Sequence, residues 1–446
     1  MSSESKNPAA ENPGRPGKNT DPDLRRLHEA LLKLDDLLVS CMRCGMCQAV
    51  CPVYGESLKE ADVTRGKIAL LENLAKDLTS DADGVNEKIN RCLLCGSCQA
   101  NCPSGVKVMD IFLNARLIVT EYKGLSPIKK AVFRGLLSRP NLFNRLTGWS
   151  SLFQGLAIKK ADPVIGTYQA PLLAPVIGRR HFPPLAKESF SKNKSLDIPP
   201  RDGGPRAAVF MGCVADKIFT SVAEATVKTL AANGVGVFMP RERACCGIPA
   251  LASGDRRSYD ELVRLNLKSL QGREFDYLIT PCATCGATIK EFWPKMGGGY
   301  GPEEKAEVDR LSSKVMDISA FLVDVLGVGR AAEKSGLRVT YHDSCHLKKS
   351  LGVSAQPRRL LELSGCQLVE MPEADRCCGS GGSFTLQHHK LSSQIGRRKR
   401  DNIISVRPEV VTAGCPACMM QLMDMLSQNG DGIPVRHVVE IYAEQL

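Results

Sequence analysis

The sequence predicts a multidomain α+β protein, in which a helical N-terminal domain is followed by two tandem α/β domains. A cysteine motif, Cys-x2-Cys-x2-Cys-x3-Cys-Pro, occurs twice near the N-terminus, and a longer five-cysteine pattern occurs twice in the C-terminal half. Strand-like and helix-like segments alternate through each long repeat, as they do in parallel doubly wound sheets. The two long repeats are therefore expected to form similar domains related by pseudo-twofold symmetry.

The two N-terminal motifs are typical of paired [4Fe–4S] clusters. In this spacing three close thiolates bind one cluster, and the fourth binds the other cluster. A zinc site or a disulfide framework is the alternative, but structural zinc is usually held by pairs of ligands and not by this repeated run. The predicted crossed ligand sets are Cys41, Cys44, Cys47 and Cys102 for one cluster, and Cys92, Cys95, Cys98 and Cys51 for the other.

Helical patterns surround these two motifs. Residues 23–38 have an amphipathic pattern that leads into the first motif, and residues 63–76 have a helical pattern between the two motifs. Residues 108–121 form a third helical pattern after the second motif. The N-terminal domain, residues 23–122, is therefore predicted to be α-helical and ferredoxin-like.

Composition limits the location of the protein. The chain has 446 residues and 19 cysteines. It contains no run of the roughly 18 apolar residues that a membrane span requires. Residues 1–22 are polar and rich in Pro and Gly, which predicts a disordered N-terminus without a secretory signal. Many cysteines without an export signal indicate metal ligation in a reducing compartment, so a cytoplasmic location is predicted.

A basic segment follows the helical domain. Between Tyr122 and Lys160 there are eight Lys or Arg residues and no acidic residue, with apolar and aromatic side chains between them. Such a segment is suited to an anionic membrane surface, to an acidic partner, or to packing with one solvated face, and these three interpretations stay open. Nucleic acid is disfavoured, because no recognition motif accompanies the charge. The basic residues are Lys123, Lys129, Lys130, Arg134, Arg139, Arg145, Lys159 and Lys160.

Prolines dominate the region from about residue 162 to residue 205. Eight prolines in this region are expected to prevent regular elements. We interpret residues 123–205 as the basic amphipathic segment followed by a Pro-rich extended connector.

The internal repeat places ten cysteines at nearly identical intervals. Successive spacings are 32, 1, 36 and 3 in the first copy and 32, 1, 37 and 3 in the second, which leaves Cys366 as the only unassigned cysteine. Domains are predicted at 206–330 and 331–446. Strands are expected at 207–211, 235–238 and 276–280 in the first domain, and at 337–341, 367–370 and 409–412 in the second. The repeated cysteines are Cys213, Cys245, Cys246, Cys282 and Cys285, then Cys345, Cys377, Cys378, Cys415 and Cys418.

Each set of five cysteines follows the carboxyl ends of the predicted strands, where open parallel sheets bind ligands. Five thiols exceed the four that one [4Fe–4S] cluster needs. A fifth sulfur could bridge irons, distort the cluster or remain free. A zinc site and a dithiol–disulfide switch at the Cys-x2-Cys pairs are the alternatives.

From about residue 37 to the C-terminus, the chain resembles the iron–sulfur subunit of glycolate oxidase and of related D-lactate dehydrogenase complexes. The segments that carry the resemblance are CMRCGMCQAVCP, CLLCGSCQANCP, RACCGIPA, DRCCGSGG, PCATCG and GCPACM. The repeated Cys-Cys-Gly domain is also similar to that of the heterodisulfide reductase catalytic subunit, of the anaerobic glycerol-3-phosphate dehydrogenase subunit that feeds quinone, and of lactate-utilisation proteins. The heterodisulfide reductase relatives imply non-cubane four-iron clusters that use all five cysteines. The glycolate oxidase branch often has an incomplete second copy, whereas both copies are complete here.

The resemblance implies two ferredoxin-type [4Fe–4S] clusters and one or two further clusters in the Cys-Cys-Gly domains. Oxidation of a 2-hydroxy acid releases a hydride, which a flavin must accept, and no dinucleotide-binding G-x-G-x-x-G follows a predicted strand here. We therefore expect a cytoplasmic oxidoreductase subunit that passes electrons from a partner FAD-linked glycolate oxidase to a quinone or other carrier. Contact with the inner face of the cell membrane stays one of the open interpretations of the basic segment. The alternatives are a D-lactate dehydrogenase iron–sulfur subunit and a heterodisulfide reductase-like catalytic subunit.

Two histidines flank Cys345 in the sequence. His342 and His346 could form a Cys–His nucleophile with it. A supporting or core role for both histidines is the favoured interpretation.

Overall fold

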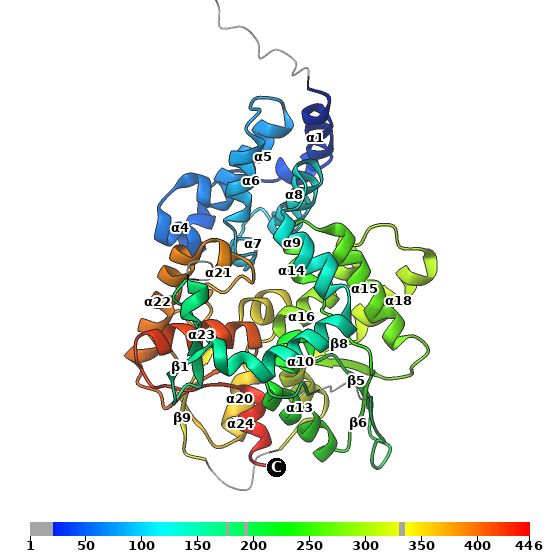
Figure 1. The fold of residues 1–446 in the computed structure, drawn as a ribbon, viewed down its shortest axis with the longest axis vertical. Coiled ribbons are helices and arrows are strands. Elements are labelled where there is room, and N and C mark those ends of the chain that lie inside the picture. Colours follow the sequence, from blue (N-terminus) through cyan, green and yellow to red (C-terminus); the bar gives the residue numbers. More distant parts are fainter. Residues whose placement is uncertain (1–20, 175–177, 191–194, 330–334) are drawn as a thin grey trace, which may run out of the picture.

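The computed structural model describes residues 21–174, 178–190, 195–329 and 335–446. The N-terminal helical domain projects from a larger body that contains both repeats (Figure 1). The first repeat and the second repeat lie side by side beneath it. The predicted disorder of residues 1–22 falls almost entirely on residues 1–20, which lie outside the described residues.

The helical domain matches the sequence pattern with one correction. The predicted helix over 23–38 is two helices, α1 (Pro22–Leu32) and α2 (Asp35–Leu38), because the chain turns at residues 33–34, where the backbone N–H of Leu34 bonds the carbonyl of Leu31 at 2.9 Å. The two longer predicted helices are confirmed as α5 (Thr64–Ala75) and α8 (Val108–Lys123). The shorter helices of the domain are α3 (Met46–Val50), α4 (Pro52–Ser57), η1 (Glu60–Asp62), α6 (Ala82–Asn90) and α7 (Ser97–Ala100).

Apolar side chains spaced three or four residues apart hold this helical domain together. Leu24, Leu27 and Leu31 lie on one face of α1 and are buried. They pack in the same core as Ile68 and Leu71 of α5. The eight N-terminal cysteines lie in loops and in the short helices α3 and α7 between the longer helices, so the packing of the domain fixes where the thiols can meet.

The segment after α8 forms helices and short strands. The basic part comprises α9 (Pro127–Lys130), the π-helical stretch η2 (Ala131–Leu137) and α10 (Pro140–Ala157). The prediction that the Pro-rich region lacks regular elements is wrong. An antiparallel sheet in the order β1-β2-β3 occurs there, because the prolines flank the short strands and do not interrupt them. Its strands are β1 (Lys159–Asp162), β2 (Thr167–Gln169) and β3 (His181–Phe182), with the short helix η3 (Pro171–Leu173) between the last two.

The first repeat forms a sheet in the order β4-β6-β5-β7-β8. Strands β5, β6, β7 and β8 are parallel, and β4 adds an antiparallel edge by pairing with β6. The strands are β4 (Leu196–Ile198), β5 (Arg206–Val209), β6 (Gly236–Met239), β7 (Tyr277–Thr280) and β8 (Val315–Asp317). The helices are α12 (Gly212–Lys217), α13 (Thr220–Ala232), α14 (Ile248–Ala252), α15 (Arg256–Leu270), α16 (Ala283–Ala287), η4 (Thr288–Phe292), α17 (Trp293–Met296), α18 (Pro302–Lys314), α19 (Ile318–Ala320) and η5 (Phe321–Val325).

The second repeat forms a parallel sheet in the order β10-β9-β11-β12. This order corresponds strand for strand to β6-β5-β7-β8 of the first repeat. The strands are β9 (Arg338–His342), β10 (Gln367–Leu368), β11 (Val410–Ala413) and β12 (Val435–His437). The helices are η6 (His346–Ser350), α20 (Ala355–Leu363), α21 (Phe384–Gln387), α22 (His389–Ser405), α23 (Pro416–Gln428) and α24 (Val438–Ala443).

The predicted strands are confirmed in both repeats, with bounds that differ by one or two residues. Three strands of these two sheets, β4, β8 and β12, were not predicted. The fold is therefore mixed α/β, with a helical ferredoxin-like part and two sheet-forming repeats. Within the described ranges, none of the helices has the length and apolar character that crossing a bilayer requires.

Candidate metal and redox site

The eight N-terminal cysteines converge on two cavities. One cavity is lined by Cys41, Cys44, Cys47 and Cys102. The other cavity is lined by Cys51, Cys92 and Cys95. Cys98 lines both cavities. Two loops far apart in sequence thus present their thiols to the same two spaces.

The ten repeat cysteines form two dense groups at the carboxyl ends of the strands. Cys213 follows β5, Cys245 and Cys246 follow β6, and Cys282 follows β7, and the second repeat has the same order. The glycine after each vicinal pair is required by geometry. Gly247 and Gly379 have φ values of +98° and +89°. A Cβ atom at Gly247 would lie 2.7 Å from the Tyr259 ring, and one at Gly379 would lie 2.7 Å from the Ser392 carbonyl oxygen.

The second cysteine of each vicinal pair is the centre of its thiol group. The pKa of Cys246 is held well below its ordinary value, because the thiols of Cys245 and Cys285 both hydrogen-bond to its sulfur. The pKa of Cys378 is lowered in the same way by Cys377 and Cys418. The two repeats therefore build the same arrangement of sulfur atoms around equivalent residues.

The two thiol groups touch each other. The pKa of the Cys415 thiol is lowered well below its ordinary value by hydrogen bonds from Cys282 of the first repeat and from Cys418 of its own repeat. The Thr284 hydroxyl lies 3.4 Å from the Cys415 sulfur, and the backbone N–H of Ala283 donates to the Gly414 carbonyl at 3.3 Å. A thiol of each repeat is thus in contact with the other repeat.

The second N-terminal cavity also reaches the second repeat. The thiol of Cys377 contacts that of Cys95, and this contact together with burial raises the pKa of Cys95 well above its ordinary value. Cys95 and Cys377 share a small apolar cluster with Val53 and Phe384. Sulfur contacts therefore run from Cys95 through the second repeat to the first repeat.

Polar side chains fix this junction. The Lys349 ammonium donates to the Ser97 hydroxyl at 2.6 Å and to the Asp375 carbonyl at 2.8 Å. His346 Nε2 lies 3.0 Å from the Leu94 carbonyl oxygen, and its Nδ1 lies 3.3 Å from the Thr284 hydroxyl. One histidine thus bridges the N-terminal domain and both repeats, and it does not face Cys345 as a catalytic base would.

A buried arginine joins the helical domain to the first repeat. The Arg116 guanidinium donates to the carbonyls of Ile89, Cys92 and Ala252 at 2.8, 2.7 and 2.8 Å. Burial lowers the pKa of this group. A guanidinium satisfied by three carbonyls from two domains holds the second cysteine loop against α14.

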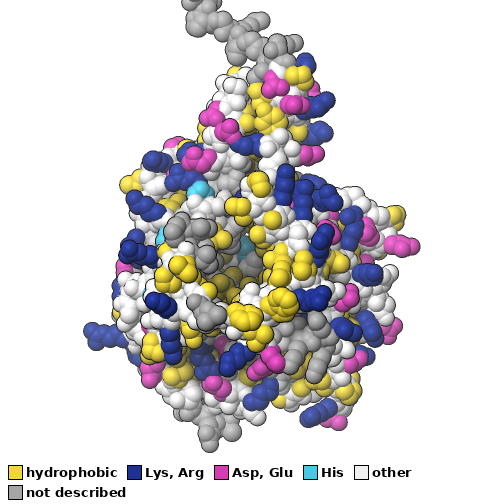
Figure 2. All heavy atoms as spheres, viewed as in Figure 1, with side chains coloured by type: hydrophobic (Ala, Val, Ile, Leu, Met, Phe, Trp, Pro, Cys, Tyr) yellow, Lys and Arg dark blue, Asp and Glu magenta, His cyan; other side chains and the backbone are white. Residues whose placement is uncertain are grey.

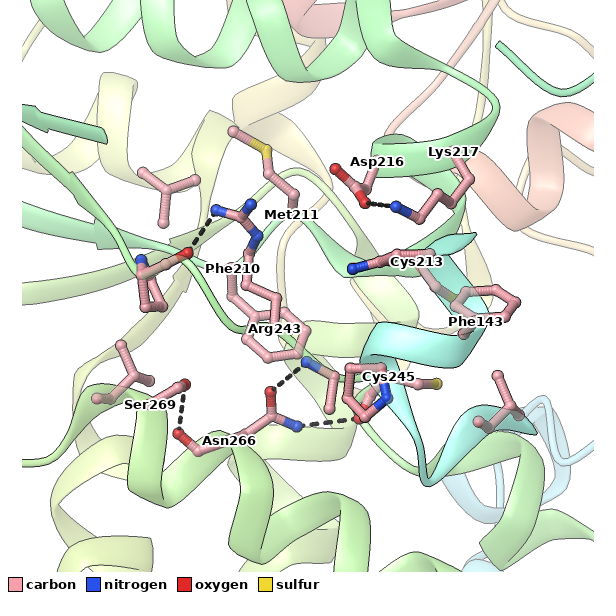
Figure 3. Close-up of a pocket in the computed structure, with 18 of the residues that line it drawn as sticks. Phe143, Phe210, Met211, Cys213, Asp216, Lys217, Arg243, Cys245, Asn266 and Ser269 are labelled. Atoms are coloured by element: carbon pink, nitrogen blue, oxygen red, sulfur yellow. Dashed lines mark hydrogen bonds and ion pairs between the residues drawn. The ribbon is translucent and has the colours of Figure 1, made fainter. Parts of the chain in front are cut away.

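A pocket lies beside Cys213 and Cys245 of the first thiol group (Figure 3). Cys213 and Cys245 line it, and most of the remaining wall is apolar. Arg243 lies beside Met211 and Phe210 and donates to the Pro240 carbonyl at 2.5 Å. Burial lowers the pKa of Arg243. Lys217 pairs with Asp216 at 2.7 Å in the same wall.

Sequence reasoning missed this cavity and the junction residues Thr284 and Lys349, and it did not predict that the cluster ligand Cys95 contacts Cys377. The cavity is built from residues far apart in the chain, including Phe143 of α10, Lys217 of α12 and Asn266 of α15. No local motif marks it. Of the residues that line this pocket, the sequence motifs marked only the cysteines Cys213 and Cys245.

The donor chemistry fits iron–sulfur clusters. All 19 cysteines are free thiols. Soft thiolate sulfur is the ligand of Fe–S clusters and of zinc. Eighteen of these thiols gather in cavities or in mutual contact, as cluster ligation requires, and Cys366 stands apart with a hydrogen-bonding contact to Ser335 at 3.3 Å.

Comparisons with known protein families agree with this chemistry. The family described as a cysteine-rich domain matches residues 207–290 and 339–423. The family described as a 4Fe-4S dicluster domain matches residues 38–106. The chain therefore holds several iron–sulfur clusters, in a ferredoxin-like domain and in two cysteine-rich domains.

Several curated proteins are similar to the chain. The "Probable glycolate oxidase iron-sulfur subunit" of Bacillus subtilis is 29% identical over 420 residues, covering 91% of this chain and 94% of that protein. "Lactate utilization protein A" of Geobacillus kaustophilus is 34% identical over 237 residues, covering 53% of this chain and 98% of that protein. A subunit of the fumarate reductase (CoM/CoB) of Methanothermobacter marburgensis is 28% identical, covering 91% of this chain and 71% of that protein.

A crystal structure of a hypothetical protein from Helicobacter pylori shares the fold, with a TM-score of 0.51 and 10% identity, over 94% of this chain and 76% of that chain. The matched domains and relatives are those of an oxidoreductase subunit that transfers electrons. The chain belongs to the family of cysteine-rich 4Fe-4S proteins that includes lactate utilization protein A and the glycolate oxidase iron–sulfur subunit.

Proposed function

We propose that the protein is the iron–sulfur subunit of a flavin-dependent glycolate dehydrogenase complex. In this proposal it accepts electrons from a partner FAD-linked oxidase and delivers them to a quinone or another carrier. The observation that carries the proposal is the unbroken series of thiol contacts from Cys95 through the second repeat to the first. Glycolate is favoured over D-lactate because the similarity to the glycolate oxidase subunit extends over 91% of the chain.

The cluster ligands follow from the same geometry. We propose that the sets Cys41, Cys44, Cys47, Cys102 and Cys51, Cys92, Cys95, Cys98 each hold a [4Fe–4S] cluster, and the two N-terminal cavities support this crossed arrangement. The five thiols of each repeat would hold one further cluster, of non-cubane form. Bound iron–sulfur clusters accept and release single electrons. The protein around these thiols holds them in contact with one another, excludes water from them and fixes the order of the cluster sites.

We propose the domain division 23–122, 123–205, 206–330 and 331–446, with a pseudo-twofold relation between the last two domains. The matching strand orders β6-β5-β7-β8 and β10-β9-β11-β12 support this relation. The thiol contact between Cys282 and Cys415 joins equivalent residues of the two Cys-x2-Cys pairs, as a twofold axis between the repeats would require.

The isolated chain is expected not to oxidise glycolate or D-lactate. Each oxidation releases two electrons as a hydride, which iron–sulfur clusters cannot accept and a flavin can. Anaerobic mixing of the reconstituted chain with substrate should therefore leave its visible absorbance unchanged until the partner flavoprotein is added. Bleaching by substrate in the absence of any flavin would refute the proposed division of labour.

The cavity beside Cys213 and Cys245 is the proposed acceptor site. It lies beside the thiols at the opposite end of the thiol series from Cys95, and its apolar wall suits a quinone ring. The Arg243 guanidinium supplies a donor for the quinone oxygen on which negative charge develops during reduction. Pro140 and Phe143 of α10 form part of the wall, so the cavity lies directly beneath that helix.

Replacing Arg243 by Gln is expected to lower quinone reduction by about 10–100-fold, because a hydrogen bond to a charged group contributes about 1.5–3 kcal/mol. Reduction of ferricyanide, which can take electrons at any exposed cluster, should change little. Arg241 is exposed, lies two residues away and does not line the cavity, so Arg241→Gln is the matched control. Equal loss with both acceptors would contradict an acceptor site at Arg243.

We propose that α10 rests on the anionic inner surface of the cell membrane, which implies a cytoplasmic protein with peripheral attachment. The outward side of α10 carries Leu146, Trp149 and Phe153, which are 43%, 69% and 63% exposed. Figure 2 shows hydrophobic side chains gathered at the centre of the face along which α10 runs in Figure 1. Besides Lys123, which pairs with Asp83, the exposed basic residues of the segment are Lys130, Arg139, Arg145, Lys159 and Lys160.

Positive charge alone would suit either an anionic lipid surface or an acidic protein. The exposed apolar face of α10 is what favours lipid. Of the eight basic residues, Arg134 pairs with Asp255 at 3.1 Å and Lys123 pairs with Asp83. Five exposed cations remain around an apolar stripe, as in helices that lie in the membrane interface. A lipid-soluble quinone would then approach the cavity from the membrane side.

A disulfide reductase is the second candidate function, and one contact favours it. Cys282 and Cys415 meet where the two repeats join, which places the two proposed one-electron cluster sites next to each other, and cleavage of a disulfide takes two electrons. The similarity to the fumarate reductase (CoM/CoB) subunit concerns the same domains. Rapid oxidation of the dithionite-reduced chain by an organic disulfide, with slow oxidation by quinone, would favour this candidate.

A further inference from the structure

His342 is a buried histidine whose ring has no partner among the described residues. The side chain is fully buried at the end of β9, and neither Nδ1 nor Nε2 makes a hydrogen bond within the described part of the chain. Another fully buried histidine, His437, is satisfied, because its Nε2 lies 2.9 Å from the Pro281 carbonyl oxygen and its Nδ1 accepts from the Val439 N–H at 3.2 Å. Buried polar groups are nearly always paired, so the His342 ring requires an explanation.

The ring of His342 lies against the thiols of the second repeat. A ring nitrogen of His342 and the sulfur atoms of Cys378 and Cys418 all lie within 4.8 Å of one another. Cys378 is the central thiol of this group, and Cys418 is one of the two thiols in contact with it. The unpartnered imidazole thus faces the middle of the site that would hold the cluster.

The first repeat has no such group. Sequence alignment of the repeats at Cys213 and Cys345 places Phe210 where the second repeat has His342. Phe210 packs edge-on against Trp293, with ring centroids 6.4 Å apart and an interplanar angle of 81°. The Trp293 indole donates to the Cys246 carbonyl at 2.9 Å, so it is already satisfied. The position in the first repeat that corresponds to His342 therefore carries an apolar ring and no N–H donor.

We propose that the imidazole N–H of His342 donates a hydrogen bond to the sulfur of Cys378 or Cys418, so that the two repeats hold electronically different clusters. The inference rests on the proposed clusters of the two repeats. Five thiols already exceed the four that a four-iron cluster needs, so a nitrogen ligand is not required, whereas a neutral imidazole offers one N–H. The Thr288 hydroxyl already donates to the Cys246 sulfur of the first repeat, so the contrast lies at one position, where the first repeat has the Phe210 ring and the second repeat has one N–H donor.

A donor at this position favours the reduced state. Reduction adds one electron, and the negative charge that it adds to the thiolate-ligated group is stabilised by an N–H directed at sulfur; hydrogen bonds to cluster sulfur are among the factors that set reduction potentials. When one electron is shared between the two repeats, the second repeat should hold it in preference to the first. The second repeat is also the one whose thiols touch Cys95 of the N-terminal domain.

His342→Phe tests the inference, because it installs the residue that the first repeat carries. Anaerobic redox titration of the full reconstituted chain, followed by electron paramagnetic resonance, should show the second-repeat signal reduced about tenfold less favourably, which is a shift of about −59 mV for a one-electron couple. The first-repeat signal and the iron content should not change. The signal that disappears in Cys418→Ser identifies the second repeat.

Two further variants keep the test decisive. His342→Gln retains an N–H donor and should keep most of the original potential, even if the Phe variant folds poorly. Cys366→Ser alters a thiol outside both thiol groups and should shift neither signal. An unchanged second-repeat potential in His342→Phe at full iron content would overturn the inference alone. Loss of that repeat's iron in His342→Phe and His342→Gln would overturn the donor role in favour of ligation. Absence of any repeat iron in the unaltered chain would overturn the proposed function as well.

Discussion

Replacing Cys282 or Cys415 by serine is expected to slow electron delivery to quinone by about 10–100-fold or more. Reduction of the partner's flavin by the substrate should keep its rate. Mutating even the outer partners of a metal site costs about 10–100-fold, and these variants remove a thiol of the site itself. Cys282 and Cys415 are also the thiols that join the two repeats. Both steps of the reaction can therefore be separated by one pair of substitutions.

Stopped-flow absorbance of the complex measures the two steps in turn. Flavin bleaching by glycolate should keep its rate in both variants, and the following reduction of quinone should become slow. Cys366→Ser is the matched control, because Cys366 is a half-buried thiol outside all the thiol groups. A fast quinone step in Cys282→Ser would mean that the first repeat is not on the path to the acceptor.

The triple substitution of Trp149, Leu152 and Phe153 by serine is expected to abolish membrane binding. Burying one large apolar side chain contributes about 1.5–3 kcal/mol, so three of them account for a loss of affinity of roughly three orders of magnitude or more. All three side chains are more than 60% exposed, at 69%, 73% and 63%, so their removal should not unfold the protein. Cosedimentation with vesicles that contain anionic lipid measures the effect.

The electrostatic part of this binding has its own signature. Gln at Lys130, Arg139 and Arg145 should weaken binding most at low salt, because ions screen exposed charges over about 10 Å at 0.1 M. The control for the serine triple variant is the double substitution Leu58→Ser and Leu386→Ser. These two side chains are 75% and 55% exposed and belong to segments other than α10. Unchanged vesicle binding in the serine triple variant at every salt concentration would mean that α10 contacts something other than lipid.

The sequence could predict the local parts of the structure. Alternating strand and helix patterns gave β5, β6 and β7 and their counterparts, because each strand is a short apolar run with a clear end. The repeat itself predicted that thiols from three strand ends would converge. The strand pattern is visible within a few residues, and the repeat is visible in the nearly identical intervals between cysteines.

The parts that were not predicted depend on contacts between distant segments. Strand β8 follows helix α18 and has only three residues, so its pattern is too short to recognise. Strand β3 in the Pro-rich region is held by the rest of the fold, since the N–H of His181 donates to Asp424 at 2.8 Å. The contact between Cys95 and Cys377 depends on how two domains dock, for which the sequence has no local signal.

His342 illustrates the limit for the candidate site. Its position beside Cys345 in the sequence suggested a partner for that thiol, but the structure directs the ring toward Cys378 and Cys418. The side chain of a residue at the end of a strand contacts residues that follow the neighbouring strands of the sheet. The partner of a buried histidine is therefore a property of the sheet and not of the adjacent sequence.

Iron and sulfide analysis of the anaerobically reconstituted chain tests the central claim most directly. Two ferredoxin-type clusters account for about eight irons, and one further four-iron cluster in each repeat raises the total to about 16 per chain, with equal sulfide. A value near 12 would mean that only one repeat is filled. Eight irons or fewer in a fully reconstituted sample, or zinc in their place, would contradict the account that the thiols of the two repeats form a continuous path for electrons.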